Sequence, residues 1–252
     1  MSANAHALPL HDHLAEAMQD VTLHLAIIKE FGHVLDGDAL ILDFGCGDGH
    51  MVRAYRASGL QAFGADVHIG TPDEWLRPIS EADGTYRLPF ADNTFDFLYS
   101  NSVLEHVEDL ESALAEMHRV LKPNGASLHF FPPRAKPIEP HVLVPFGGVL
   151  QSRPWLLLWA YAGIRHTFQG GLSASNTALR NYDYLHHKAF YRSKRQMEEQ
   201  FCRYFRNVMF ANGQMIRHSY GRAKALAPLA DRLPFVAASY GCFHQRCVYF
   251  RR

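Results

Sequence analysis

One glycine-rich segment restricts the possible folds of this chain more than any other. Residues 39–44 form a short apolar run, which predicts a strand buried on both faces. Residues 45–49 continue it as Gly-Cys-Gly-Asp-Gly, and residues 50–58 predict a helix. Glycine allows a sharp turn and the close approach of a ligand to the main chain, and the N–H groups of a helix N-terminus attract negative charge. The segment therefore predicts a ligand-binding turn at one edge of a sheet.

A carboxylate at the end of the next predicted strand supports the same interpretation. That strand covers residues 60–66 and ends in Asp66. The carboxyl ends of parallel strands lie at one edge of their sheet, and an acid there can accept hydrogen bonds from both ribose hydroxyls of an adenosine. The turn and Asp66 together indicate an adenosine-containing ligand.

Strands and helices alternate through the first half of the chain. Further strands are predicted at residues 94–99 and 126–131, with a helix over residues 109–121 between them. This alternation is typical of βαβ units, so we predict an α/β fold with a doubly wound sheet. The later predicted elements are a helix at 193–201 and strands at 204–210 and 247–250.

Two segments differ from this alternation. Apolar residues recur every three or four positions in the first part of the chain, so residues 1–36 predict an N-terminal helical segment. Residues 132–190 begin with a proline-rich stretch. They are too long for a loop without secondary structure, and we expect a partly helical insertion. We expect one domain spanning residues 1–252.

The glycine spacing distinguishes two classes of adenosine-binding protein. The dinucleotide fingerprint is G-x-G-x-x-G, and His50 stands where its third glycine would be. Residues 43–49 read D-x-G-x-G-x-G instead. This pattern resembles the first motif of the class I S-adenosylmethionine-dependent methyltransferases.

Three later segments extend the resemblance in chain order. They are residues 88–96 (LPFADNTFD), residues 100–107 (SNSVLEHV) and residues 119–125 (RVLKPNG). They resemble, in turn, the LPF-x-D-x-[ST]-FD, S-x-x-x-x-EHV and RVLKPGG stretches of one large branch of that family. With the glycine motif, the resemblance covers about residues 39–131.

The resemblance implies a Rossmann-like seven-stranded sheet, mostly parallel with an antiparallel last strand. It also implies S-adenosyl-L-methionine as the cofactor. Asp66 would bind the ribose, Asp83 the adenine amino group, and Asn101 would lie beside the methionine end or the acceptor. The loop residues, in which Asp43 would order the turn and the glycines would hold the methionine part, are Asp43, Gly45, Cys46, Gly47 and Gly49.

Methyl transfer depends largely on positioning the acceptor against the methyl group. A hydroxyl acceptor must also lose a proton, and histidine titrates in a range suited to a general base. His106, after the fourth strand of the family pattern, and His141, just past the fifth, are the candidate catalytic bases. The alternatives are a packing or capping role for His106 and an exposed loop position for His141. We expect His129, in the middle of a strand, to lie in the core.

The insertion at residues 132–190 is the candidate acceptor-binding segment. Its aromatic side chains either cover the acceptor or form a small core under a helical hairpin; they are Trp155, Trp159, Tyr161, Phe168 and Tyr182. We predict a small-molecule acceptor, with a hydroxyl of a sugar, glycan or secondary metabolite favoured over an amine.

Composition argues against several other classes. Lys plus Arg and Asp plus Glu number 25 each, so the formal net charge is zero, which disfavours nucleic acid as the main partner. The four cysteines are too few for a disulfide scaffold and include no Cys-x-x-Cys pair, so we expect reduced thiols and a cytoplasmic protein. The longest apolar run, residues 155–164, is about half of the ~20 residues of a spanning helix. We therefore expect no stable membrane insertion, and peripheral contact is left open.

Some properties are not fixed by these patterns. The histidine clusters lack a second pair at metal-site spacing, so the sequence predicts no metal site. The oligomeric state is left open. Two other functions are also kept: a non-catalytic cofactor-binding scaffold, which the complete glycine motif disfavours, and an NAD(P)-dependent oxidoreductase, which the glycine spacing disfavours.

Overall fold

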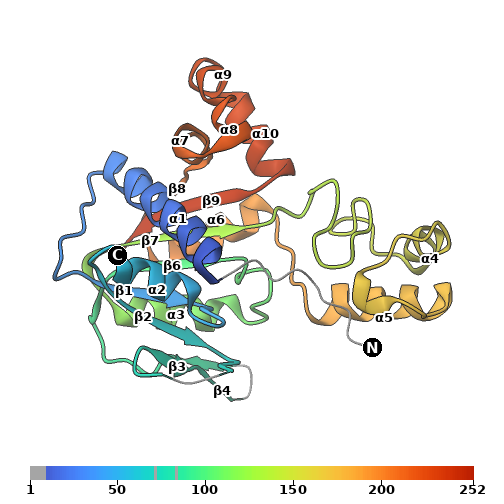
Figure 1. Cartoon of the computed structure of the whole chain (residues 1–252), viewed down its shortest axis with the longest axis horizontal. Coiled ribbons are helices and arrows are strands. Elements are labelled where there is room, and N and C mark those ends of the chain that lie inside the picture. The colour runs from blue at the N-terminus through green and yellow to red at the C-terminus, as the bar shows by residue number, and fades with distance from the viewer. Residues whose placement is uncertain (1–9, 71–72, 83–84) are drawn as a thin grey trace.

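The sheet at the centre of the fold has seven strands (Figure 1). The computed structural model describes residues 10–70, 73–82 and 85–252. The strand order is β3-β2-β1-β6-β7-β9-β8. The strands are β1 (Leu40–Phe44), β2 (Gln61–Asp66), β3 (Leu76–Pro78), β6 (Phe95–Asn101), β7 (Leu121–Phe131), β8 (Arg206–Phe210) and β9 (Arg246–Arg251).

The strand directions confirm the predicted fold class. β1 pairs in parallel with both β2 and β6, and β6 pairs in parallel with β7. β9 is antiparallel to both of its neighbours, β7 and β8. The last strand of the chain therefore runs against an otherwise parallel sheet.

Helices cover both faces of the sheet and give a three-layer arrangement. One face packs against α1 (Leu10–Glu30), α2 (His50–Ala57) and α7 (Asn212–His218). The other face packs against α3 (Leu110–Val120) and α6 (Lys194–Tyr204). The strands between these layers are apolar almost throughout, and β1 and β7 are buried along most of their length. Burial on both faces explains why these strands appear in the sequence as continuous apolar runs.

Helix starts follow ordinary capping chemistry. The Asp109 carboxylate accepts a hydrogen bond from the backbone N–H of Ser112 at the start of α3. The Ser193 hydroxyl accepts one from the N–H of Gln196 at the start of α6, and the Gln196 side chain accepts one from the N–H of Ser193. These reciprocal bonds satisfy amide groups that the first turn leaves unpaired.

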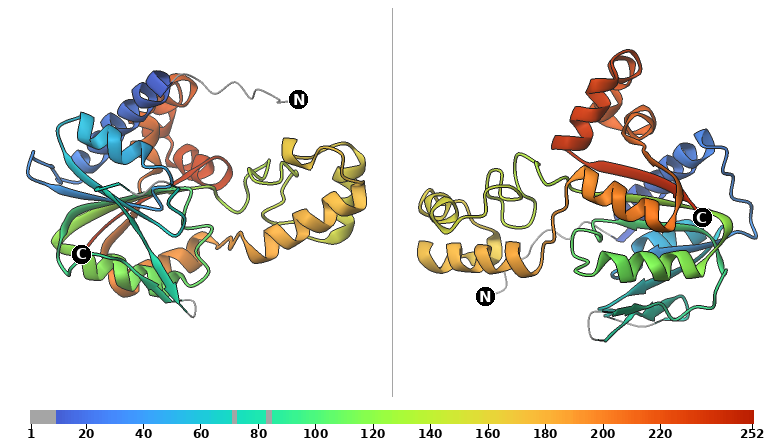
Figure 2. Two further views of the ribbon diagram at one scale, coloured as in Figure 1. Left: turned by 60° about the horizontal axis from the view of Figure 1, so that its bottom comes forward. Right: turned by 180° about the vertical axis from the view of Figure 1, so that it is seen from behind.

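The segment at residues 132–190 projects from the sheet as a separate lobe (Figure 2). It contains α4 (Arg153–Tyr161), a short 3-10 helix (Thr167–Gln169) and α5 (Ala174–His187). Its own apolar cluster includes Leu156, which is fully buried, with Trp155, Trp159 and Tyr182 packed against it. Three of the five aromatic residues named as a possible cover thus belong to the core of the lobe.

The sequence analysis missed several elements. A two-stranded hairpin, β4 (Ser80–Ala82) with β5 (Thr85–Arg87), lies beside the sheet. Between β8 and β9 the chain forms α7 and then α8 (Gly221–Lys224), α9 (Ala227–Arg232) and α10 (Pro234–Phe243). Within the described part of the chain, no helix is both long and apolar enough to cross a membrane.

Arg119 fixes the connection that leads into β6. Its guanidinium donates hydrogen bonds to both carboxylate oxygens of Glu116, each 2.7 Å away, and to the carbonyl oxygens of Leu88 and Phe90. The backbone N–H of Leu88 in turn donates to Glu116. Because only 10% of the Glu116 side chain is exposed, loss of the guanidinium would leave a largely buried carboxylate short of partners.

We predict that Arg119→Met lowers the free energy of unfolding by about 2 kcal/mol, because a bidentate and partly buried ion pair is lost. Urea denaturation followed by circular dichroism measures the change. Arg195→Met is the matched control, since Arg195 pairs with Glu199 on an exposed helix surface and such pairs contribute little. Equal effects of the two variants would contradict the structural role given to Arg119.

Candidate active site

The candidate site lies at the carboxyl edge of the sheet. β1 is flanked there by β2 on one side and β6 on the other, so the chain connections leave β1 in opposite directions. Ligands of open α/β sheets bind at such switch points. The segments that follow β1, β2 and β6 therefore meet at one place, although Phe44 and Asn101 are 57 positions apart in the sequence.

The glycine segment forms a tight loop between β1 and α2. Gly45, Gly47 and Gly49 have φ angles of +79°, +50° and +76°, in the region that favours glycine. A Cβ on Gly45 would come within 2.3 Å of the Val103 side chain, so this position also requires glycine for space. A Cβ on Gly47 would meet no atom within 4 Å. The loop is thus packed on one side and open at Gly47.

Asp66 holds this loop against the end of β2. One oxygen of its carboxylate accepts a hydrogen bond from the N–H of Gly47 at 2.8 Å, and the other accepts one from the N–H of His68 at 2.8 Å. Each oxygen keeps acceptor capacity, because a carboxylate offers about four lone-pair positions. Asp66 also lines the cavity described below, so this capacity is available to hydroxyl donors of a ligand.

Asp43 and Cys46 are buried in the structure. Only 3% of Asp43 is exposed, and burial, together with the nearby charge of Asp66, raises the pKa of its carboxyl to about 8. The Cys46 sulfur packs close to Gly64, and burial raises the pKa of its thiol. Neither side chain lines the cavity described below.

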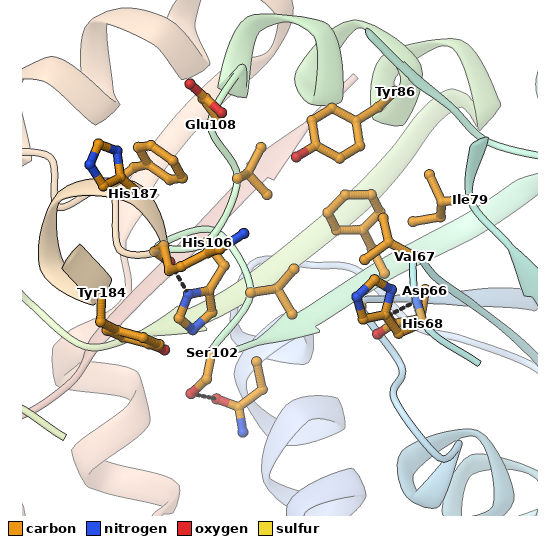
Figure 3. A pocket seen from close by; sticks show the side chains of 17 residues that line it. Asp66, Val67, His68, Ile79, Tyr86, Ser102, His106, Glu108, Tyr184 and His187 are labelled. Carbon is orange, nitrogen blue, oxygen red and sulfur yellow. Dashed lines mark hydrogen bonds between the residues drawn. The ribbon is translucent and has the colours of Figure 1, made fainter. Parts of the chain in front are cut away.

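A cavity of about 520 Å³ opens beside the loop. Figure 3 shows Asp66, His68, Ile79 and Tyr86 on one side of it and His106, Tyr184 and His187 on the other. Gly45, Asn101 and Ser102 also line it. The sequence-predicted residues Gly45, Asp66, Asn101 and His106 therefore share one cavity, and α5 of the lobe supplies its far wall.

His106, which lines this cavity, contacts His141, which does not line it. Their Nε2 atoms are 3.1 Å apart. His106 Nδ1 lies 2.7 Å from the carbonyl oxygen of Lys188, and His141 Nδ1 lies 2.6 Å from a carboxylate oxygen of Glu139. Both Nδ1 atoms therefore carry a proton, an assignment made from their acceptors. Burial lowers the pKa of His106.

The turn that carries His106 is fastened to the chain that returns from the lobe. The N–H of Phe190 donates to the carbonyl oxygen of Glu105 at 2.6 Å. The Arg192 guanidinium donates to the carbonyl oxygens of Val107 and Glu108 at 2.9 and 2.7 Å. The position of His106 thus depends on residues more than 80 positions away along the sequence.

The remaining predicted residues are placed differently. Asp83 lies outside the described residues. Gly47, Gly49 and Cys46 belong to the loop and do not line the main cavity, and Gly47 instead borders a smaller hollow with Asp73 and Leu76. His129 is fully buried and lies 2.7 Å from the Ser100 hydroxyl, so its prediction as a core residue is confirmed.

Sequence reasoning missed several side chains near the cavity. Glu139 lies two residues before His141. The Tyr191 hydroxyl, outside the expected motifs, donates a hydrogen bond to the Glu139 carboxylate. Tyr184, not one of the five named aromatic residues, contributes the ring on the cavity wall. The one sequence signal that could have indicated Glu139 is its position two residues before His141, a candidate base.

Comparison with known proteins gives matches to one family. Residues 42–128 match the family model described as a methyltransferase domain. The malonyl-[acyl-carrier protein] O-methyltransferase of Pseudescherichia vulneris is 33% identical over 96 residues, which cover 35% of this chain and 37% of that protein. The ubiquinone/menaquinone biosynthesis C-methyltransferase UbiE of Desulfotalea psychrophila is 47% identical over 134 residues, covering 49% of this chain and 54% of that protein.

A solved structure shares the whole fold. The S-adenosylmethionine-dependent methyltransferase from Mesorhizobium loti superposes with a TM-score of 0.51 at 19% identity, covering 95% of this chain and 100% of that chain. The curated relatives are matched over shorter stretches, about a third to a half of their length.

The sheet order, the antiparallel last strand and the glycine loop define a class I methyltransferase fold. Residues 42–128 therefore match a methyltransferase domain, and the chain as a whole shares the fold of a solved S-adenosylmethionine-dependent methyltransferase. S-adenosyl-L-methionine is the cofactor of this class, and the site fits it: Asp66 presents free acceptor positions to the cavity, and the backbone beside Gly47 is open.

We predict that Asp43→Asn stabilises the protein at alkaline pH. The carboxyl pKa is about 8 in the folded state and about 4 in the unfolded state. The folded state therefore holds the proton more tightly, and stability falls as the pH rises from about 4 through 8. An amide has no charge to lose, so at pH 8 the variant should exceed the wild type by at least about 1 kcal/mol.

Thermal denaturation between pH 5 and 8.5 checks this difference. Asp38→Asn, at an exposed position before β1, controls for the loss of a surface charge. Parallel stability profiles of the wild type and Asp43→Asn would show that the Asp43 carboxyl ionises freely in the folded protein.

Proposed function

We propose that this chain transfers a methyl group from S-adenosyl-L-methionine to a hydroxyl group of a small molecule. The observation that carries the proposal is the cavity itself, which has the Asp66 carboxylate at one end and His106, in contact with His141, at the other. A hydroxyl of a sugar, glycan or secondary metabolite is the favoured acceptor. The same cavity would have no use for its histidine pair in a protein that only bound the cofactor.

The cofactor would lie along the loop and the end of β2. Asp66 would accept hydrogen bonds from the ribose hydroxyls, and Val67, Ile79 and Tyr86 supply apolar surface for an adenine ring. Gly45 and Asn101 border the part of the cavity between Asp66 and His106. When bound there, the cofactor supplies a methyl group on a positively charged sulfur, which is already electrophilic.

The acceptor would occupy the end formed by His106, Tyr184 and Lys188. Because His106 Nδ1 donates to the Lys188 carbonyl, the Nε2 lone pair is the one free to take a proton from a hydroxyl. His141 is held in the same tautomer by Glu139, so its Nε2 can share that proton at 3.1 Å. His106 and His141 are therefore proposed as the bases.

Two relatives inform the choice of acceptor atom. The P. vulneris protein is named as an O-methyltransferase and the D. psychrophila protein as a C-methyltransferase. A carbon acceptor activated by a neighbouring hydroxyl also has to lose a proton, so both kinds of chemistry need a base at this place. The half-buried histidine pair favours proton-losing acceptors over amines that react as free bases.

We predict that S-adenosylhomocysteine binds to the purified chain and that Asp66→Ala weakens this binding at least tenfold, because two charge-assisted hydrogen bonds are lost. Isothermal titration calorimetry measures both affinities. Asp38→Ala, an exposed carboxylate, serves as the matched control and should leave the affinity unchanged. Binding of NADH instead of S-adenosylhomocysteine would support the oxidoreductase alternative and overturn this proposal.

We predict that His106→Ala and His141→Ala reduce methyl transfer by about 10²–10⁴-fold, the usual contribution of a general base. Methyl-labelled S-adenosylmethionine, offered with a panel of phenols, sugars and carboxylic acids, gives the transfer rate. The affinity for S-adenosylhomocysteine should stay within twofold in both variants. Transfer at the wild-type rate in the double variant would exclude the pair as bases.

A further inference from the structure

Glu105, His106 and His141 form a cluster of three potential metal ligands. One ligand atom from each residue lies within 4.8 Å of the other two. The two imidazole Nε2 atoms are 3.1 Å apart, and His106 Nε2 is 3.9 Å from Glu105 Oε1. Ligand atoms at about 2.0–2.1 Å from one tetrahedral ion are roughly 3.3 Å apart. The cluster is therefore close to the geometry of a three-ligand site.

The histidine rings are oriented as metal ligands usually are. Metal-binding histidines commonly donate the N–H of their other nitrogen to a carboxylate or a backbone carbonyl. His141 Nδ1 meets the Glu139 carboxylate, and His106 Nδ1 meets the carbonyl oxygen of Lys188. Both Nε2 lone pairs then point toward the same small volume. Two lone pairs at 3.1 Å repel one another unless a proton or a cation lies between them.

Glu105 supplies a second, independent observation. Its side chain is 2% exposed, and neither of its carboxylate oxygens has a hydrogen-bond partner among the described residues. A buried carboxylate without partners is strongly unfavourable. Glu139, the neighbouring buried acid, shows the contrast, because it accepts hydrogen bonds from two backbone N–H groups, from His141 and from Tyr191. The unpartnered oxygens of Glu105 therefore call for a cation.

We propose that Glu105, His106 and His141 bind one divalent transition-metal ion. Two imidazoles and one carboxylate suit zinc, iron, cobalt or manganese, since such mixed nitrogen and oxygen sites select first-row ions. Three protein ligands leave at least one coordination position for water or for an oxygen of the acceptor, as in catalytic metal sites. The sequence predicted no metal site, because metal-site spacings are local and His141 is 35 positions beyond His106. Only the fold brings these two histidines together.

The ion would join two parts of the chain. Glu105 and His106 lie in the turn after β6, and His141 lies in the lobe, in the irregular segment before α4. Since His106 also lines the cavity, an acceptor hydroxyl bound to the ion would lose its proton more easily. This effect on the acceptor rests on the proposed function. With the ion bound, His106 and His141 act as its ligands rather than as free bases. Binding of the ion itself does not depend on methyl transfer.

Cobalt(II) titration of the chelator-treated 252-residue chain tests the site, because four- or five-coordinate cobalt absorbs visibly. We expect one equivalent to give an absorption band and to raise the melting temperature, and Zn²⁺ to displace it. His141→Ala and Glu105→Gln should each weaken binding at least tenfold. The Glu105→Gln side chain keeps the size of the native one, and circular dichroism confirms folding.

His186→Ala is the matched control, since His186 is an exposed histidine on α5 that does not line the cavity; it should bind cobalt like the wild type. No visible band with folded protein, or an unchanged band in both ligand variants, would overturn the proposal in favour of a shared proton or of adventitious binding by other histidines.

S-adenosylhomocysteine titration of the metal-free protein separates the two proposals, because it tests the cofactor site alone. Asp66→Ala should keep cobalt binding intact.

Discussion

The site depends first on how the glycine loop is tied to β2. The N–H groups of Gly45 and Cys46 both donate to the carbonyl oxygen of Ala65, at 2.7 and 3.2 Å, and Asp66 accepts from Gly47. These three bonds consume amide groups that a free loop would present to water, and they set the direction in which α2 begins. The packing of Gly45 against Val103 fixes the same loop against the segment after β6. One short loop therefore contacts both the end of β2 and the segment after β6.

The acceptor end has a different origin, because it is assembled from distant parts of the chain. The returning segment at residues 188–192 binds the turn of His106 through main-chain and arginine hydrogen bonds. The lobe supplies Tyr184 and His187 to the cavity and has its own apolar core. A lobe that packs internally can change its cavity-facing residues without disturbing the sheet, which suits the acceptor-binding role proposed for this segment.

The sequence predicted the parts of the fold that depend on local patterns. β1, β6 and most of β7 read as apolar runs, whereas β3 was not predicted, and Asp109 and Ser193 cap α3 and α6 close to their predicted starts. The helices between β8 and β9 were not predicted, because their residues are mostly half-exposed and short helices lack a clear apolar period. The arrangement of Glu105, Glu139 and His141 was not predictable either. Tertiary contacts create it, and neither periodicity nor spacing carries that information.

Three buried carboxylates near the site show how the same group acquires different properties. Burial raises the pKa of Glu105 to about 7 and that of Asp43 to about 8. The hydrogen bonds that Glu139 accepts from His141 and Tyr191 outweigh its burial and lower its pKa. Acids whose environments move their pKa in opposite directions mark functional centres more often than structural ones.

Burying an acid lowers the stability of a fold unless its carboxylate is well partnered, and this chain buries Asp43, Glu105 and Glu139 near the site. The apolar layers on both faces of the sheet, which include fully buried Phe95, Phe201 and Tyr249, offset that loss. The stabilisation by these apolar layers is proportional to the buried area, whereas the effect of each carboxylate depends on its particular partners. The site is concentrated at the carboxyl edge because strand ends there leave polar groups without sheet partners. The interior of the sheet, in β1, β6 and most of β7, is buried and supplies the stabilising apolar area.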